Sequence, residues 1–305
     1  MSEKDSGLIK KIYFTVLYLN CLKHPPTTFE VWHHFLDVSQ KSGPIALSEI
    51  IESLKFLKNQ KKIFLERGFW LIETENNLGQ QRIFKQKNSL IKLKKIKKRL
   101  KWINFLPFIR GVFITGTLSF QNSSKESDWD VLVITKKNRI WLGRLILIVF
   151  LSLTGQKRTD LKIKDKFCLN HFLTEKNLIS ENRNEYTGCE YTFIFPILNE
   201  RLFNNFIRLN WNWTRRFCPN FQLPKVHHSF FSVQKEGSFK VRNLFEISLE
   251  AFGIDGYLNR VCKNKMIARI KRKSKNFESG AIIIYNDGEL AFWPEFKNLN
   301  KILKI

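Results

Sequence analysis

The sequence predicts an α+β fold in which helices cover one side of a mixed sheet. Two short apolar segments rich in β-branched residues, 110–115 and 131–134, flank a polar turn and are predicted to be buried strands. Apolar residues at helical spacing predict a helix at 140–154, directly after the second strand. Strands and helices in this order are typical of a sheet covered by helices.

Composition and charge narrow the possible classes of protein. Of 305 residues, 43% are hydrophobic, which is enough for a packed core and argues against disorder. The formal net charge of +25 favours acidic partners such as nucleic acid, nucleotides or an anionic membrane surface. An AT-biased genome also enriches a protein in Lys, Asn, Ile and Phe, so both explanations of the charge remain open.

Cysteines and apolar stretches bear on the location of the protein. The five cysteines are scattered without a Cys-x-x-Cys pair, which favours neither a zinc site nor a disulfide framework. The first residues are polar, unlike a secretory signal. The apolar stretch 145–151 is shorter than the ~20 residues of a membrane span. We therefore expect a cytoplasmic protein with no membrane span.

Residues 1–80 are predicted to form a small winged-helix-like domain. Apolar spacing and turn residues predict three helices, at 8–22, 29–38 and 49–59. They also predict a hairpin of two strands, at 62–65 and 69–72. Units of this kind often bind DNA through a helix in the major groove. A packing or dimerisation module is the alternative.

Residues 81–109 are predicted to form a basic linker helix. From Arg82 to Arg110 the chain carries many Lys and Arg residues and no acid. Leu93, Ile96 and Leu100 recur at helical spacing, so the helix is amphipathic with a basic outer face. That face can follow a phosphate backbone, or the segment can be a solvated linker.

The chemistry is concentrated between residues 116 and 130. Asp128 and Asp130 are two apart at the start of a strand, so their carboxylates share one face and repel each other unless a cation lies between them. Mg²⁺ or Mn²⁺ is the natural cation for oxygen ligands. Gly116 permits close approach of a phosphate and Thr117 offers a hydroxyl donor. A metal pair facing a phosphate site is the apparatus of phosphoryl or nucleotidyl transfer.

This arrangement resembles the nucleotidyltransferase superfamily, which has the DNA polymerase β-like fold. The family signature is Gly-Ser, a loop, and Asp-x-Asp on a strand; here Gly116-Thr117 precedes Asp128 and Asp130. The resemblance covers roughly 110–173. It implies a core at 110–200 that binds a nucleoside triphosphate at Gly116 and Thr117 and Mg²⁺ at the two aspartates. The implied reaction transfers a nucleoside monophosphate to a hydroxyl of an unknown acceptor.

Two loop serines and the wider order of elements complete this resemblance. Ser119 and Ser127 lie in the loop and are candidate nucleotide-binding residues. A helical region with a terminal hairpin follows at 201–305, the hairpin turning at Asn286-Asp287-Gly288. The whole order resembles uncharacterised bacterial nucleotidyltransferase-domain proteins with an N-terminal winged-helix-like unit.

The family also uses a third carboxylate on a neighbouring strand, where it helps to activate the acceptor hydroxyl. The matching predicted strand is 166–173, and its equivalent position is at or near Asn170, which is not a carboxylate. Asp160 and Asp165 precede that strand and can substitute only if the register differs. The alternative function is therefore a catalytically impaired protein of this fold that acts as a nucleic-acid-binding regulator through its basic helices.

Overall fold

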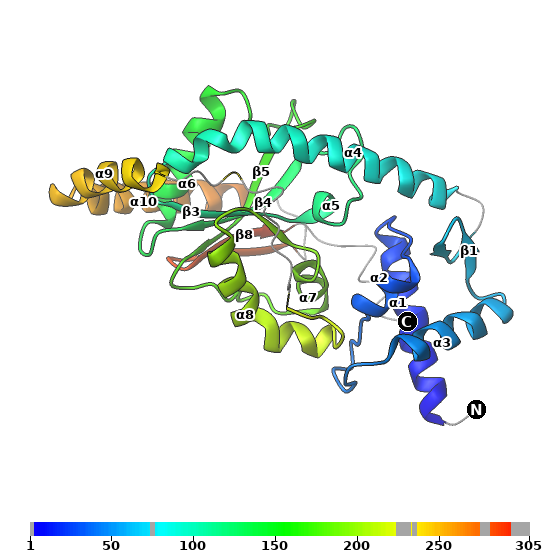
Figure 1. Cartoon of the computed structure of the whole chain (residues 1–305). Coiled ribbons are helices and arrows are strands. Elements are labelled where there is room, and N and C mark those ends of the chain that lie inside the picture. Colours follow the sequence, from blue (N-terminus) through cyan, green and yellow to red (C-terminus); the bar gives the residue numbers. More distant parts are fainter. Residues whose placement is uncertain (1–2, 74–76, 224–232, 234–236, 275–280, 294–305) are drawn as a thin grey trace.

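The computed structural model describes residues 3–73, 77–223, 233, 237–274 and 281–293. These residues form an α+β structure with an N-terminal helical unit, a long helix and a six-stranded mixed sheet (Figure 1). The predicted α+β class and the mixed sheet are thus confirmed. Among the helices of the described residues, none has the length and apolarity to cross a membrane.

The N-terminal unit contains the predicted three helices and hairpin. They are α1 (Glu3–Cys21), α2 (Thr28–His33), α3 (Leu47–Asn59), β1 (Phe64–Glu66) and β2 (Phe69–Leu71). Helix α2 is shorter than predicted: a capping box between Thr27 and Glu30 starts it. Beyond its end, the Asp37 carboxylate accepts hydrogen bonds from the backbone of Ser39 and Ser42, which fixes a turn instead of a further helical turn. The winged-helix-like assignment stays a prediction.

Helix α4 (Leu78–Arg99) corresponds to the predicted basic helix, and a 3₁₀ helix, η1 (Leu100–Phe105), continues it. Figure 1 shows α4 running from the β1–β2 hairpin across one face of the sheet. Leu93 and Ile96 pack into the core, while Lys94 and Lys98 are exposed. The helix is therefore amphipathic, as its spacing predicts.

The sheet has the strand order β6-β3-β4-β5-β8-β7. Strands β4 and β5 pair in parallel, and the other neighbouring pairs are antiparallel. The predicted C-terminal hairpin is confirmed, and it extends the main sheet because β8 pairs with β5. The strands are β3 (Ile109–Ile114), β4 (Trp129–Thr135), β5 (Phe167–Thr174), β6 (Phe195–Leu198), β7 (Ile282–Tyr285) and β8 (Glu289–Trp293).

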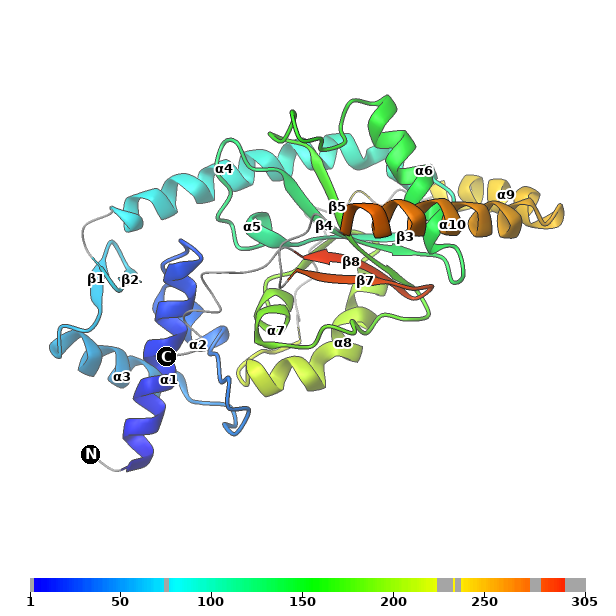
Figure 2. The same cartoon turned by 180° about the vertical axis from the view of Figure 1, so that it is seen from behind.

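Helices cover both faces of the sheet, which corrects the prediction of helices on one side. Along β4, Val131 and Val133 belong to one buried cluster, with residues of α4, α6 (Ile140–Leu153) and α10 (Ile254–Ser274). Leu132 belongs to another, with residues of α7 (Glu185–Tyr191) and α8 (Glu200–Phe217). A continuous apolar strand needs cover on both faces. Figures 1 and 2 show α6 and α10 on one face and α7 and α8 on the other.

Candidate metal and nucleotide site

The turn after β3 lies directly against β4. Helix α5 (Gly116–Ser119) starts there, and the Thr115 amide donates to the carbonyl of Asp130 at 3.1 Å. Gly116 has φ +61°, and a Cβ on it would lie 2.5 Å from Oδ2 of Asp130. A side chain at this position is therefore excluded both by backbone conformation and by space. Glycine at position 116 thus allows the turn to pack directly against the carboxylate of Asp130.

Two side chains of β5 approach Asp130, next to a bulge in that strand. Asp130 pairs with Cys168, but Leu132 pairs with His171, so β5 contains one extra residue between these pairs. The amide of Asn170 donates to Oδ1 of Asp130 at 3.3 Å. One ligand atom from each of Asp128, Asp130 and Cys168 lies within 4.8 Å of the others. The structure thus forms a cluster that could hold a metal ion.

Arg158, from the loop after α6, completes the surroundings of the two aspartates. Its Nη1 donates to Oδ2 of Asp128 at 2.6 Å and to Sγ of Cys168 at 3.4 Å. The guanidinium side chain is 43% exposed, so it can leave Asp128 without unpacking the core. Asp128 is therefore charge-compensated by a movable group.

The acids of this site have raised pKa values. Burial, and then the charge of Asp128, raise the pKa of Asp130 to about 7. Burial also raises the pKa of Cys168 to about 12, with Asp130 and Asp128 adding to the effect, so the thiol stays protonated at neutral pH. Such shifts, in a cluster with few cationic partners, are typical of functional sites.

Glu190, on α7, is a buried acid that the sequence analysis did not identify. Its Oε1 accepts a hydrogen bond from the amide of Gly116 at 3.1 Å. Its pKa is raised to about 7, mainly by burial and also by the charge of Asp130, while the hydrogen bond from Gly116 opposes the shift. The sequence feature that could have identified it is an acid between Cys189 and Tyr191 in an apolar segment, since acids are seldom buried without a partner.

The remaining predicted nucleotide-binding residues differ in their surroundings. Thr117 is exposed on the turn beside Gly116. The hydroxyl of Ser119 is buried and donates to the carbonyl of Gly116 at 2.8 Å, and that of Ser127 donates to the carbonyl of Ser124 at 3.0 Å. Gly116, Asp128 and Asp130 are therefore brought together, whereas roles for Thr117, Ser119 and Ser127 stay predictions.

The equivalent of a third carboxylate is expected at or near Asn170, and the residues of β5 at that place are Cys168 and Asn170. Both approach Asp130, and neither is an acid. Asp165 accepts hydrogen bonds from Lys92 at 2.8 Å and Lys95 at 2.5 Å, which engages both of its oxygens. Asp160 is exposed in the loop before β5. Strand β5 itself, Phe167–Thr174, carries no carboxylate.

A cavity of about 960 Å³ lies between the N-terminal unit, α4 and the end of α5. Ser119, Phe120 and Tyr191 line it on the side of the candidate site. Its only charged lining residues in the described part of the chain are Glu30 and Arg82, which pair at 2.6 Å. Aromatic rings make up much of the wall: Phe29, Trp32, His33, His34, Phe120, Phe193, Phe195 and Phe221. The cavity is therefore aromatic and without net charge.

Comparisons with protein-family models, with curated proteins and with solved structures found no match. The interpretation of the site thus depends on its geometry.

Proposed function

We propose that the protein is a nucleotidyltransferase that moves a nucleoside monophosphate from a nucleoside triphosphate to an acceptor hydroxyl with Mg²⁺ or Mn²⁺. The observation that carries the proposal is the contact between the Gly116 turn and Asp130, with Asp128 alongside. A backbone turn open to phosphate and two carboxylates on one strand are the parts that such a transfer requires.

The residues present fit a hard divalent ion better than a soft one. Mg²⁺ is usually bound by one or two carboxylates together with substrate phosphates, which matches Asp128 and Asp130. Cys168 is the softer neighbour, but its raised pKa keeps it a thiol and a weak ligand. An ion held here would supply positive charge to the phosphates during transfer.

The protein's own side chains orient the substrate around this ion. The Gly116–Thr117 turn allows close approach of the triphosphate at Gly116 and offers it the Thr117 hydroxyl. Glu190 accepts from Gly116 and thereby holds the turn in position. Arg158, once released from Asp128, remains close enough to contact a phosphate oxygen. Because no carboxylate on β5 is present to take the hydroxyl proton, we expect slow transfer.

The acceptor is proposed to enter the aromatic cavity beside α5. Its single pair of charges is internally compensated, and burial lowers the pKa of His33 and His34, which keeps both rings neutral. An uncharged acceptor with a planar ring suits these walls, since rings stack at low cost in desolvation. This assigns the cavity to an aromatic alcohol or a similar neutral molecule.

Calorimetric titration of each nucleoside triphosphate with Mn²⁺ tests the proposal. The Asp128→Asn/Asp130→Asn variant should lose metal-dependent binding, and Gly116→Ala should weaken it because the new Cβ would meet Asp130. Asp160→Asn is the matched control, since it removes an exposed acid from the nearby loop. Metal-dependent binding that survives in the double variant would exclude the site.

The second candidate function is a protein of this fold with impaired turnover that binds nucleic acid. The observation that favours it is the pair Cys168 and Asn170 at the position of the third carboxylate. The three helices and hairpin of residues 3–73 are also compatible with a winged-helix-like unit. Triphosphate binding without pyrophosphate release, over a panel of neutral alcohols, would favour this candidate.

A further inference from the structure

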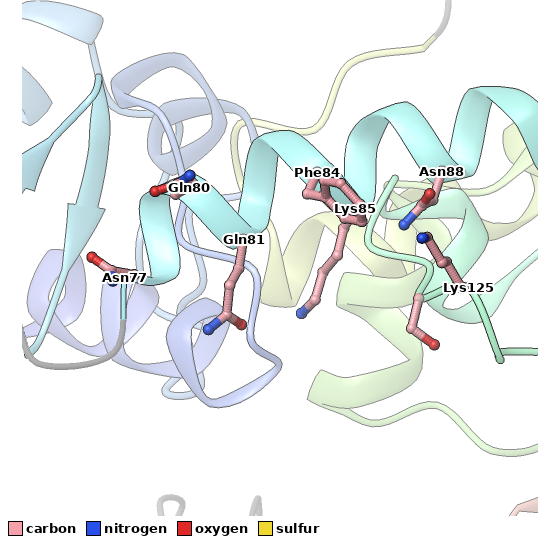
Figure 3. A pocket seen from close by; sticks show the side chains of 8 residues that line it. Asn77, Gln80, Gln81, Phe84, Lys85, Asn88 and Lys125 are labelled. Carbon is pink, nitrogen blue, oxygen red and sulfur yellow. The ribbon is translucent and has the colours of Figure 1, made fainter.

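A second pocket, of about 550 Å³, lies along α4 and contains none of the residues assigned to the transfer site. Figure 3 shows the side chains that line it, most of them on α4 or at its first residues, with Lys125 opposite on a neighbouring loop. The lining residues are Asn77, Gln80, Gln81, Phe84, Lys85, Asn88, Ser124 and Lys125. Their chemistry is mixed, with carboxamides, ammonium groups and one aromatic ring.

The α4 residues of this pocket occupy one face of the helix. Positions 77, 80, 81, 84, 85 and 88 recur at intervals of three or four, which places them above one another. This is not the packing face, because Leu93 and Ile96 turn toward the core. Phe84 is nonetheless on it, with 54% of its surface exposed. A large ring in this position contributes little to the core and is available to a ligand.

The pocket is also positively charged. Nζ of Lys125 lies 5.4 Å from the centre of the Phe84 ring. Lys85 donates to the carbonyl of Lys23 at 3.2 Å, and burial together with the charges of Lys23 and Arg82 lowers its pKa. None of the described residues that line the pocket is acidic. A bound anion would therefore relieve repulsion among these cations.

We propose that this face of α4 binds single-stranded nucleic acid, with one base stacked on Phe84. Exposed aromatic rings stack unpaired bases, and ammonium groups bind the phosphates on either side. The carboxamides of Gln80 and Asn88 offer donors and acceptors to the base edge. A duplex would keep its bases inside the helix, away from Phe84. A pocket of this volume accommodates one nucleotide.

The path of the strand is indicated by further lysines of α4. Lys87, Lys94 and Lys98 are exposed and follow one another at intervals of seven and four, so they form one stripe beside the pocket. Phosphates of neighbouring nucleotides would contact this stripe. The proposal does not depend on nucleotidyl transfer, because the two sites share no residue.

Fluorescence anisotropy with a labelled single-stranded RNA of mixed sequence tests the stacking. Phe84→Ala should weaken binding about tenfold, as expected for the loss of one stacked base. Phe84→Leu should weaken it similarly while it keeps an apolar side chain on the helix. Phe245→Ala is the control, because Phe245 is 59% exposed on α9 (Ser238–Ala251) and outside the pocket. Unchanged affinity in both Phe84 variants would overturn the proposal.

Salt dependence and competition test the charged part. The Lys85→Gln/Lys125→Gln variant should reduce the slope of log affinity against log salt by about 1.4, or roughly 0.7 for each lost phosphate contact. Lys240→Gln, at an exposed lysine of α9, should leave the slope unchanged. Duplex RNA that competes better than single-stranded RNA would contradict the proposal. Phe84→Ala should bind nucleoside triphosphate with the same affinity as the unmodified protein. This result would distinguish a failure of the nucleic-acid proposal from a failure of the proposed transfer site.

Discussion

Asp130 lies on β4 and Asp165 lies in the loop before the neighbouring strand β5, and the two acids have opposite electrostatic surroundings. Asp165 directly precedes β5, and its two oxygens accept from Lys92 and Lys95. Burial alone would raise its pKa, but these hydrogen bonds lower it below the ordinary value of 3.8. Arg99 also donates to the Asp165 carbonyl at 2.7 Å. This acid fixes α4 to the loop before β5.

The main charged neighbour of Asp130 is another acid, whereas the charged neighbours of Asp165 are lysines. The side chain of Asp130 contacts the amide of Asn170 and the thiol of Cys168, and the charge of Asp128 acts on it more strongly than that of Arg158. Its pKa is accordingly raised to about 7. The comparison teaches which acid is structural: the protein compensates Asp165 with its own cations and leaves Asp130 in need of an external one.

The largest expected effect is the loss of stability in Asp165→Asn. The Lys92 side chain is only 3% exposed, so the variant leaves a buried ammonium group without its carboxylate. We expect the free energy of unfolding to fall by about 3 kcal/mol. Urea denaturation at pH 7 measures the change, with Asp160→Asn as control because that acid is exposed. Equal free energies of unfolding for the two variants would show that Asp165 does not stabilise the fold.

Asp130→Asn should act in the opposite direction, and only at higher pH. In the unfolded chain this acid ionises near 3.8, and in the folded metal-free protein near 7. Between these values the unfolded state releases its proton first, so the free energy of unfolding falls as pH rises and levels off above about 7. The asparagine variant has no such loss. It should be more stable than the parent at pH 8, and the difference should disappear as the pH is lowered to 4.

Urea denaturation at the two pH values, without added metal, measures this difference. Asp128→Asn is the useful comparison, because Asp128 already pairs with Arg158, and its removal leaves a half-exposed guanidinium that still donates to Cys168. A destabilised Asp130→Asn at pH 8 would mean that the carboxylate contributes to the fold, as Asp165 does.

Local patterns in the sequence predict the parts of the site that are formed by neighbouring segments. Two apolar strands around a turn predict that Gly116 and Asp130 meet, because consecutive strands commonly pair. The parallel partner of β4 and the approximate position of Asn170 follow from the next apolar segment. Four consecutive apolar residues from Val131 to Ile134 also indicated burial on both faces, although helices were expected on one side.

The other contacts of the site depend on tertiary structure that no short pattern contains. Glu190 reaches Gly116 across 74 residues, and Arg158 reaches Asp128 across 30. The bulge next to Cys168 and Asn170 is defined only by the pairing of β4 with β5. The aromatic cavity likewise combines α2, α4 and the segment before β6. Each of these features needs the relative placement of elements far apart in the chain.

The smallest expected effect belongs to Arg158→Gln, and it separates charge compensation from structure. The ion pair with Asp128 involves a side chain that is 43% exposed, so stability should change by no more than about 0.5 kcal/mol. Without the competing guanidinium, Mn²⁺ should bind about fivefold more tightly in the absence of nucleotide, which corresponds to about 1 kcal/mol. Electron paramagnetic resonance of free Mn²⁺ measures this, with Lys162→Gln at an exposed lysine of the same loop as control. Weaker Mn²⁺ binding in Arg158→Gln alone would show that Arg158 holds Asp128 in its ligand position, and unchanged binding would remove Asp128 from the ligand set.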